Sequence, residues 1–159
     1  MASPAAGSVM VAATRIHTGK TSVSMALISK LTRVFGRGRV AYFKPVGHHW
    51  VEADTAGGVC KVDKDALVAK VHFGLSADVR DMSPLIISSG YTRRFLDGQI
   101  DTDAQWERIS NAFETLRRTH DYVVVEGTGH TAVGSVVGVS NATVAARLGL
   151  GVALVANGG

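Results

Sequence analysis

The sequence predicts an α/β domain in which a parallel sheet carries helices on both faces. Short apolar runs alternate along the chain with longer segments whose apolar residues recur every three or four positions. The chain has no internal repeat and no low-complexity linker that would divide it. Strands separated by helices pair in parallel, and the crossover helices then cover both faces of the sheet.

Two strands and two helices are expected in the first half of the chain. Residues 8–13 form an apolar, partly β-branched run that is typical of a strand buried on both faces. A helical apolar stripe covers residues 20–35. Residues 39–43 form a second strand, closed by Pro45, which cannot donate to a strand ladder. Residues 65–73 form the second helix, and glycines follow both helices.

The second half of the chain predicts the clearest helix, over residues 102–120. One face of it carries apolar side chains at spacings of three and four, namely Trp106, Ile109, Phe113 and Leu116. We interpret these as core residues. A strand at 121–126, a helix at 141–148 and a strand of buried type at 152–156 follow. Residues 85–87 form a further short strand in an otherwise mixed segment.

Composition excludes several classes of protein. With 46% hydrophobic and 19% charged residues, the 159-residue chain is neither disordered nor larger than one domain. Its apolar runs are too short to span a membrane, and its start lacks the pattern of a secretory signal. The single cysteine, Cys60, cannot form an internal disulfide. We therefore expect a cytoplasmic protein, with an organellar location as the alternative.

Charge indicates neither a nucleic-acid nor a membrane partner. The formal net charge is +4, but the basic residues are scattered along the chain. The one loose cluster contains Lys30, Arg33, Arg37 and Arg39. A nucleic-acid surface would need a denser basic stripe with interleaved aromatic residues. We interpret the cluster as a solvated helix end and turn.

The connection between the first strand and the first helix has the pattern of a phosphate-binding loop. Residues 14–21 read T-R-I-H-T-G-K-T and enter the helix directly. Amides at a helix N-terminus bind phosphate oxygens, and Gly19 lets the backbone approach them closely. In such a loop Lys20 reaches the β- and γ-phosphates and the Thr21 hydroxyl binds Mg²⁺. Thr14 replaces the usual first glycine, and the alternative is a helix that merely begins after a glycine.

Two charged residues directly follow other predicted strands. Lys44 stands in K-P-V after the second strand, and Glu126 opens an E-G-T-G turn after the third. Ligands of an open parallel sheet collect beyond the carboxyl ends of its strands, so both should lie near the loop. Carboxylates and a threonine hydroxyl suit Mg²⁺, and lysines neutralise a phosphoryl group in transfer. Singly, each could be an ordinary strand-end lysine or turn acid.

These motifs resemble the dethiobiotin synthetase family of P-loop NTPases. Its variant loop has a threonine at the place of Thr14 and ends in G-K-T, and it has a lysine-proline-valine motif like that at 44–46. The resemblance implies that Lys44 contacts substrate and the transferring phosphate. It further implies that Asp65, at a helix start, and Glu126 bind the metal.

A narrower resemblance is to the amino-terminal, dethiobiotin-synthetase-like domain of long phosphotransacetylases. It covers the chain from Val9 to Gly159, and its most specific stretches are S-N-A at 140–142 and N-G-G at 157–159. It also includes S-P-L at 83–85, S-G-Y-T-R-R-F-L-D-G at 89–98 and E-G-T-G-H at 126–130. In that branch the domain continues past the double glycine. We therefore interpret residues 1–159 as one nucleotide-binding domain whose C-terminal part is missing.

The chain departs from the dethiobiotin synthetase pattern in two places. That family follows its lysine-proline-valine motif with a small residue and a substrate-binding serine, whereas His48 and His49 follow Gly47 here. A second threonine of the loop is replaced by Ile16. These changes argue against binding of diaminononanoate and leave nucleotide binding largely intact.

The predicted site combines the loop, the strand ends and the glycine-rich turn. Lys20 and Lys44 are the expected catalytic residues, and Thr21, Asp65 and Glu126 the expected metal ligands. The expected nucleotide contacts are Thr14, Thr18, Gly19, Lys20, Thr21, Gly127, Gly129 and His130. His130 could equally be an ordinary loop residue. ATP and Mg²⁺ are the expected cofactors, and the histidines and Cys60 do not match a zinc spacing.

Three functions are compatible with these motifs. The first is an Mg²⁺-ATP-binding P-loop domain of the phosphotransacetylase-associated branch. The second is an ATP-dependent carboxylating ligase with dethiobiotin synthetase activity, and the third is a non-catalytic regulatory or assembly module of an acyltransferase. Expected partners are a nucleotide, a small acid or amine substrate, and either a second copy of the chain or an acyltransferase domain.

Overall fold

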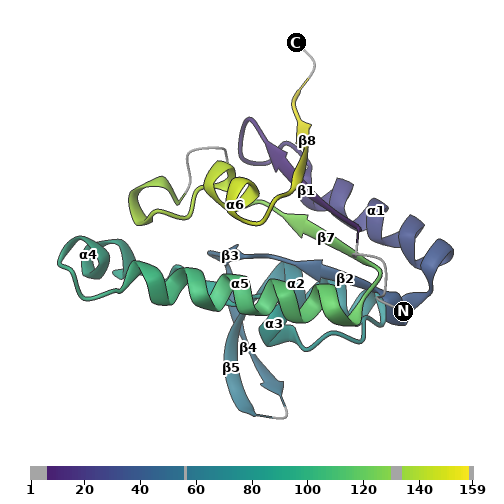
Figure 1. Ribbon diagram of the computed structural model, residues 1–159, viewed down its shortest axis with the longest axis horizontal. Helices are drawn as coiled ribbons and strands as arrows, with labels where there is room; N and C mark the ends of the chain where they lie inside the picture. The colour runs from purple at the N-terminus through teal and green to yellow at the C-terminus, as the bar shows by residue number, and fades with distance from the viewer. Residues whose placement is uncertain (1–6, 56, 130–133, 158–159) are drawn as a thin grey trace.

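A four-stranded parallel sheet forms the centre of the fold (Figure 1). The computed structural model describes residues 7–55, 57–129 and 134–157. Across the sheet the strand order is β2-β7-β1-β8. The strands are β1 (Gly7–Ala13), β2 (Val40–Phe43), β7 (Tyr122–Glu126) and β8 (Gly151–Val155). The predicted fold class is confirmed, and all four expected strands of the sheet are present.

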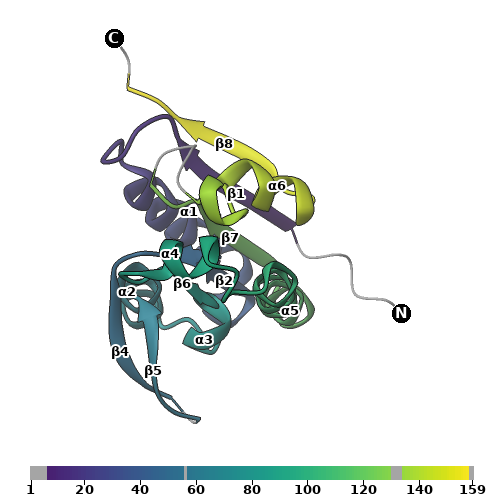
Figure 2. The same cartoon turned by 90° about the vertical axis from the view of Figure 1, so that its left-hand side faces the viewer.

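Helices cover both faces of this sheet (Figure 2). They are α1 (Lys20–Phe35), α2 (Lys64–Phe73), α5 (Thr102–Thr119) and α6 (Asn141–Arg147). The first two lie on one face, and α5 and α6 lie on the other. No helix in the described part of the chain has the length and apolar character needed to cross a membrane.

The predicted apolar face of α5 lies in the core. Trp106, Ile109, Phe113 and Leu116 are all buried. The ring of Phe113 packs 5.4 Å, centroid to centroid, from the ring of Phe43 at the end of β2. Burial of such side chains is the main contribution to the stability of the sheet, because it removes large apolar surfaces from water.

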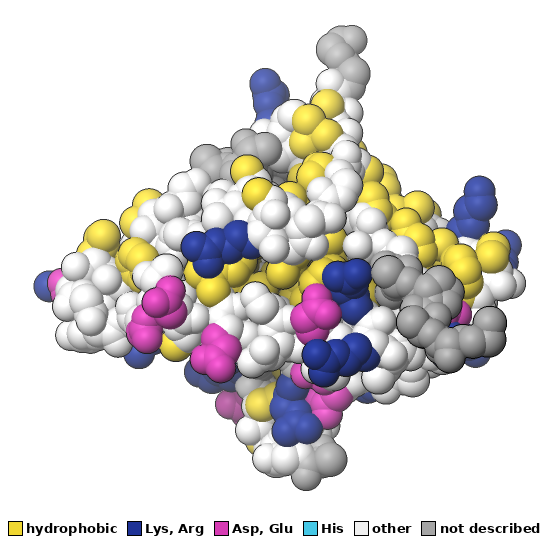
Figure 3. Space-filling view, viewed as in Figure 1, with side chains coloured by type: hydrophobic (Ala, Val, Ile, Leu, Met, Phe, Trp, Pro, Cys, Tyr) yellow, Lys and Arg dark blue, Asp and Glu magenta, His cyan; other side chains and the backbone are white. Residues whose placement is uncertain are grey.

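The last strand differs from the expectation. Residues 152–156 were expected to form a strand of buried type, but β8 lies at the edge of the sheet, with Val152 51% and Leu154 57% exposed. Among the described residues, β1 is its only partner strand. Figure 3 shows apolar side chains in the region of β8 on the surface of the molecule. An apolar run identifies a strand, but its burial depends on what packs against it.

The segment between β2 and α5 is more elaborate than the sequence pattern indicates. β4 (Trp50–Thr55) and β5 (Gly58–Asp63) form an antiparallel hairpin that projects from the molecule (Figure 1) and was not predicted. β3 (Val46–Gly47) pairs in parallel with β6 (Leu85–Ile86), which confirms the short strand expected there. The remaining short elements are η1 (Arg37–Arg39), α3 (Val79–Met82), α4 (Tyr91–Leu96) and η2 (Ser135–Val137).

The contact between α5 and β2 provides a test of the core. Phe113→Ala should lower the free energy of unfolding by about 3–5 kcal/mol, because it removes a fully buried ring and leaves a cavity. Urea denaturation followed by circular dichroism measures this. Val71→Ala is the control, since Val71 on α2 is 74% exposed and should change stability by about 0.5 kcal/mol or less. Equal losses in the two variants would contradict this packing.

Candidate functional site

The phosphate-binding loop predicted from the sequence connects β1 to α1 at the carboxyl edge of the sheet. Lys20 is the first residue of α1, and Gly19 before it has a φ of 94°. That left-handed conformation favours glycine and directs the chain sharply into the helix. The Thr14 amide donates to the Val155 carbonyl, and the Thr18 hydroxyl donates to the Arg15 carbonyl. The first bond anchors the start of the loop to the end of β8, and the second closes a turn within the loop.

His17 is the one non-glycine residue with a positive φ, 58°, in the part of the chain that the structure describes. The left-handed region disfavours most side chains, although histidine enters it more readily than most. His17 also lines the cavity in front of the loop. The loop therefore holds an unfavourable backbone conformation at the place where a ligand would bind.

The ammonium group of Lys20 reaches across to the glycine-rich turn after β7. Its side chain is largely buried, and Nζ donates to the Gly129 carbonyl. Burial lowers the pKa of Lys20 below its usual value, and the negative charge of Glu126 offsets only part of that effect. Lys20 is therefore a poorly solvated cation whose present acceptor is uncharged.

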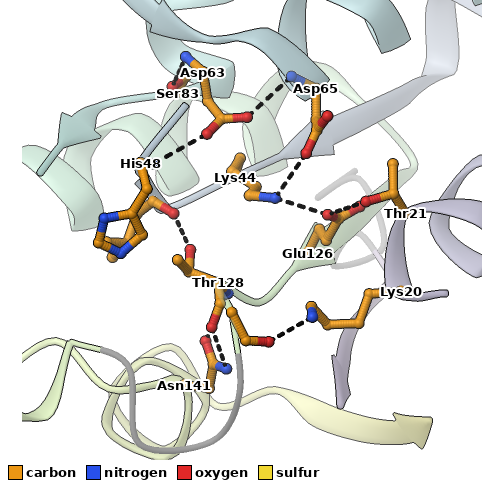
Figure 4. Close-up of polar contacts among 12 residues, drawn as sticks. Lys20, Thr21, Lys44, His48, Asp63, Asp65, Ser83, Glu126, Thr128 and Asn141 are labelled. Carbon is orange, nitrogen blue, oxygen red and sulfur yellow. Dashed lines mark hydrogen bonds and ion pairs between the residues drawn. The ribbon is translucent and has the colours of Figure 1, made fainter. Parts of the chain in front are cut away.

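Glu126, the last residue of β7, is the centre of the site and is 0% exposed. Its Oε1 atom accepts a hydrogen bond of 2.9 Å from the Thr21 hydroxyl and one of 2.7 Å from Lys44 Nζ. Lys44 Nζ also lies 3.2 Å from Asp65 Oδ2 (Figure 4). Three residues, from the end of β2 and the starts of α1 and α2, thus gather around the carboxylate at the end of β7.

Lys44 is held among carboxylates, and its environment differs from that of Lys20. Burial alone would lower the pKa of Lys44, but the charges of Glu126, Asp63 and Asp65 outweigh it and raise that pKa. The carboxylates of the cluster also affect the pKa of Tyr42, which precedes Lys44 by two residues. Burial, followed by the charge of Glu126, raises the pKa of Tyr42 well above its usual value.

Asp63 holds the residues around the cluster in place through hydrogen bonds with backbone and side-chain groups. It caps the N-terminus of α2, where Oδ1 accepts from the Asp65 amide at 3.0 Å, while Oδ2 accepts from the His48 amide at 3.2 Å. Its own amide donates to the Ser83 hydroxyl at 2.8 Å. Burial raises the pKa of Asp63 although Lys44 acts against that shift. Asp63 therefore fixes the start of α2, and with it the position of Asp65.

The turn after Glu126 is fixed by α6. Asn141, the first residue of α6, accepts from the Thr128 amide at 2.9 Å and donates to the Thr128 carbonyl at 3.0 Å. A Cβ atom on Gly127 would lie 2.9 Å from the Asn141 side-chain oxygen, so only glycine fits there without displacement. Neither Asp63, Ser83 nor Asn141 was predicted as a site residue, because each acts through backbone groups that the sequence does not place.

A cavity of about 500 Å³ opens between the loop and the cluster. Its lining includes Gly19, Lys20, Thr21, Lys44, Asp65, Glu126 and Gly129 from the predicted site. A smaller cavity of about 320 Å³ adjoins it and shares Ile16, Lys44, His49 and Gly129. Three predicted nucleotide contacts line neither cavity, namely Thr14, Thr18 and Gly127. They instead fix the backbone of the loop and of the glycine-rich turn. His130 lies outside the described residues.

Comparison with known proteins identifies the family. The family model AAA_26, described as an AAA domain, matches residues 7–159, which is nearly the whole chain. The chain belongs to this family. The family consists of P-loop NTPases and includes dethiobiotin-synthetase-like members, so the fold described above is that of a P-loop NTPase domain. No curated protein matches the chain at a significant level.

P-loop NTPases in general bind a nucleotide together with Mg²⁺, and the residues at the end of β7 suit that ion. The described residues contain no group of three or more His, Cys, Asp or Glu side chains placed to hold a metal. Two carboxylates and the Thr21 hydroxyl nevertheless offer hard oxygen ligands, and Mg²⁺ usually completes its shell with water and phosphate oxygens. The Glu126 Oε2 atom is buried, and the Tyr42 hydroxyl interacts with the same carboxylate. The donor set of Thr21, Asp65 and Glu126 thus fits Mg²⁺ in its chemistry.

The backbone of His17 gives a test of the P-loop conformation. His17→Gly should leave stability unchanged or raise it, because glycine adopts a positive φ without steric cost. His17→Val should lower the free energy of unfolding by about 1–2 kcal/mol, because a β-branched side chain is disfavoured in the left-handed region. Urea titrations of the two variants measure the difference. A valine variant as stable as the glycine variant would contradict the conformation described for residue 17.

Proposed function

We propose that the chain binds Mg²⁺-ATP in the larger cavity, with the phosphates at the N-terminus of α1. The observation that carries this proposal is the convergence of Lys20, Thr21, Lys44, Asp65 and Glu126, from four separate segments, on that one cavity. A P-loop fold alone implies nucleotide binding in general. The convergence of two lysines with two carboxylates supports the more specific proposal that Mg²⁺-ATP binds in this cavity.

The β- and γ-phosphates lie, in this proposal, against the amides of the loop and the ammonium of Lys20. Helix N-termini favour anions because unsatisfied amides and the helix dipole point toward them. Lys20 is buried against a neutral carbonyl, so an anionic phosphate would be a better partner for its charge. Thr14, Thr18 and Gly127 act on this nucleotide indirectly, by holding the loop and the turn.

Thr21, Asp65 and Glu126 are the proposed metal ligands. With ATP bound, Mg²⁺ held by these residues would supply positive charge that neutralises the charge developing on the transferred group. Glu126 provides a buried carboxylate, and Asp65 provides one that is 23% exposed and open to the cavity. The Thr21 hydroxyl donates to Glu126, and Thr21 lines the same cavity, so its oxygen can serve as a further ligand.

Lys44 lines both cavities, and in this proposal it contacts a phosphoryl group that moves between them. The smaller cavity would then hold the acceptor, a small acid or amine. His48 lines that cavity at the place of the substrate-binding serine of dethiobiotin synthetases, and His49, which follows it, lines the cavity as well. This difference disfavours diaminononanoate as the acceptor. The resemblance of other stretches to the amino-terminal domain of long phosphotransacetylases favours instead a nucleotide-binding domain that accompanies an acyltransferase.

Lys20→Ala tests nucleotide binding directly. At an ATP concentration of about 100 times the dissociation constant, a bound ligand stabilises the folded state by about 2.7 kcal/mol. Mg²⁺-ATP should therefore raise the melting temperature of the wild-type chain and leave Lys20→Ala unchanged. Lys30→Ala, in an exposed position further along α1, should respond like the wild type. An ATP-dependent rise retained in Lys20→Ala would refute the proposal.

A second assay separates turnover from binding. Phosphate release from ATP, measured with and without diaminononanoate and bicarbonate, distinguishes the carboxylating ligase from a nucleotide-binding domain. We expect no stimulation by these substrates, because His48, which lines the smaller cavity, stands at the place of that family's serine. A stoichiometric, substrate-dependent release would show that the chain is a ligase.

A further inference from the structure

Lys44 occupies the position between the two proposed carboxylate ligands of the metal. Its Nζ atom is 2.7 Å from Glu126 Oε1 and 3.2 Å from Asp65 Oδ2. The lysine side chain is buried, as is that of Glu126. The ammonium group therefore neutralises, in this conformation, the same oxygens that a divalent cation would need.

We propose that Lys44 is the resident counter-ion of the metal site, and that a divalent cation displaces its ammonium group from Glu126. The inference rests on the proposed function, because it assumes that Asp65 and Glu126 bind the metal. It adds that metal and Lys44 compete for these carboxylates. Metal binding then becomes the event that releases Lys44 for its contact with the transferred group.

The geometry leaves little room for both cations at once. Mg²⁺ binds carboxylate oxygens at about 2.0–2.1 Å, so an ion on Glu126 Oε1 would lie within about 5 Å of the present position of Nζ. Oε1 already accepts from Thr21 and Lys44, and the other oxygen, Oε2, is buried away from solvent. Two positive charges at such a separation in a buried place repel each other strongly. This repulsion favours displacement of Lys44 when the metal arrives.

The smaller cavity provides the space into which the Lys44 side chain can move. Lys44 lines the smaller cavity as well as the larger one, so its flexible side chain has space next to its present position. Lys20 cannot take the same role, because its ammonium is bound to the Gly129 carbonyl rather than to either carboxylate. The displaced Lys44 would lie at the boundary where the two cavities meet.

Binding of Mn²⁺ without nucleotide tests the competition. Free Mn²⁺ is counted by electron paramagnetic resonance in titrations of the wild type, Lys44→Met and Lys64→Met. Lys44→Met should bind Mn²⁺ at least about tenfold more tightly, because the competing charge is gone. Lys64 lines the same cavity without an ion pair to the described carboxylates, so its variant should gain only about threefold or less through screened charge.

A measurement on the wild-type chain covers the case in which Lys44→Met does not fold. Acetylation of lysines by a water-soluble active ester, mapped by mass spectrometry, reports whether an ammonium group is held in an ion pair. Saturating Mg²⁺ should raise the modification rate of Lys44 and leave Lys64 unchanged, relative to KCl at equal ionic strength.

Two results would overturn the inference. They are Mn²⁺ binding that is equal or weaker in folded Lys44→Met, and a Lys44 modification rate that Mg²⁺ leaves unchanged. If the wild type still shows Mg²⁺-ATP stabilisation in these cases, only the competition fails and the proposed function stands. A wild type that binds neither Mn²⁺ nor Mg²⁺-ATP would refute both.

Discussion

Burial of the Glu126 carboxylate is the constraint on which the rest of the site depends. A buried charge is costly unless partners compensate it, and Glu126 at 0% exposure receives a hydroxyl and an ammonium on one oxygen. Those partners come from the loop after β1 and from the end of β2, which flank β7 in the sheet. The strand order therefore brings Thr21, Lys44 and Glu126 together, and the apolar core holds the strands in that order.

The two lysines of the cavity show how local partners assign different roles to one residue type. Lys20 is buried against a carbonyl, and its pKa is lowered, mainly by burial. Lys44 is buried against carboxylates, and its pKa is raised because their charges outweigh burial. A phosphate would complete the surroundings of Lys20, whereas a metal ion would disturb those of Lys44. The charge of Lys20 thus has no anionic hydrogen-bond partner, whereas that of Lys44 is already balanced by carboxylates.

Local pattern was sufficient to predict the sheet strands, the major helices and the loop, because each depends on periodicity and on residues adjacent in sequence. The β4–β5 hairpin was missed, although Val51 and Ala53 alternate with polar residues before glycines. The exposure of β8 could not be predicted, since it depends on what packs beside that strand. Asp63 and Asn141 were missed for a similar reason, because their roles consist of hydrogen bonds to backbone groups brought close only by the fold. The positions of Lys44 and Glu126 at neighbouring strand ends were predicted, but their direct ion pair, which joins positions 82 residues apart, was not.

The dependence of ATP affinity on Mg²⁺ in Glu126→Gln tests the central claim most directly. Glutamine keeps the size and an acceptor oxygen of Glu126 but removes the charge that the metal needs. Calorimetric titration of ATP, with and without Mg²⁺, should show tighter binding with Mg²⁺ for the wild type. Glu126→Gln should bind ATP with an affinity that Mg²⁺ no longer increases. An unchanged gain from Mg²⁺ in Glu126→Gln would contradict the assignment of this carboxylate as the centre of the metal and nucleotide site.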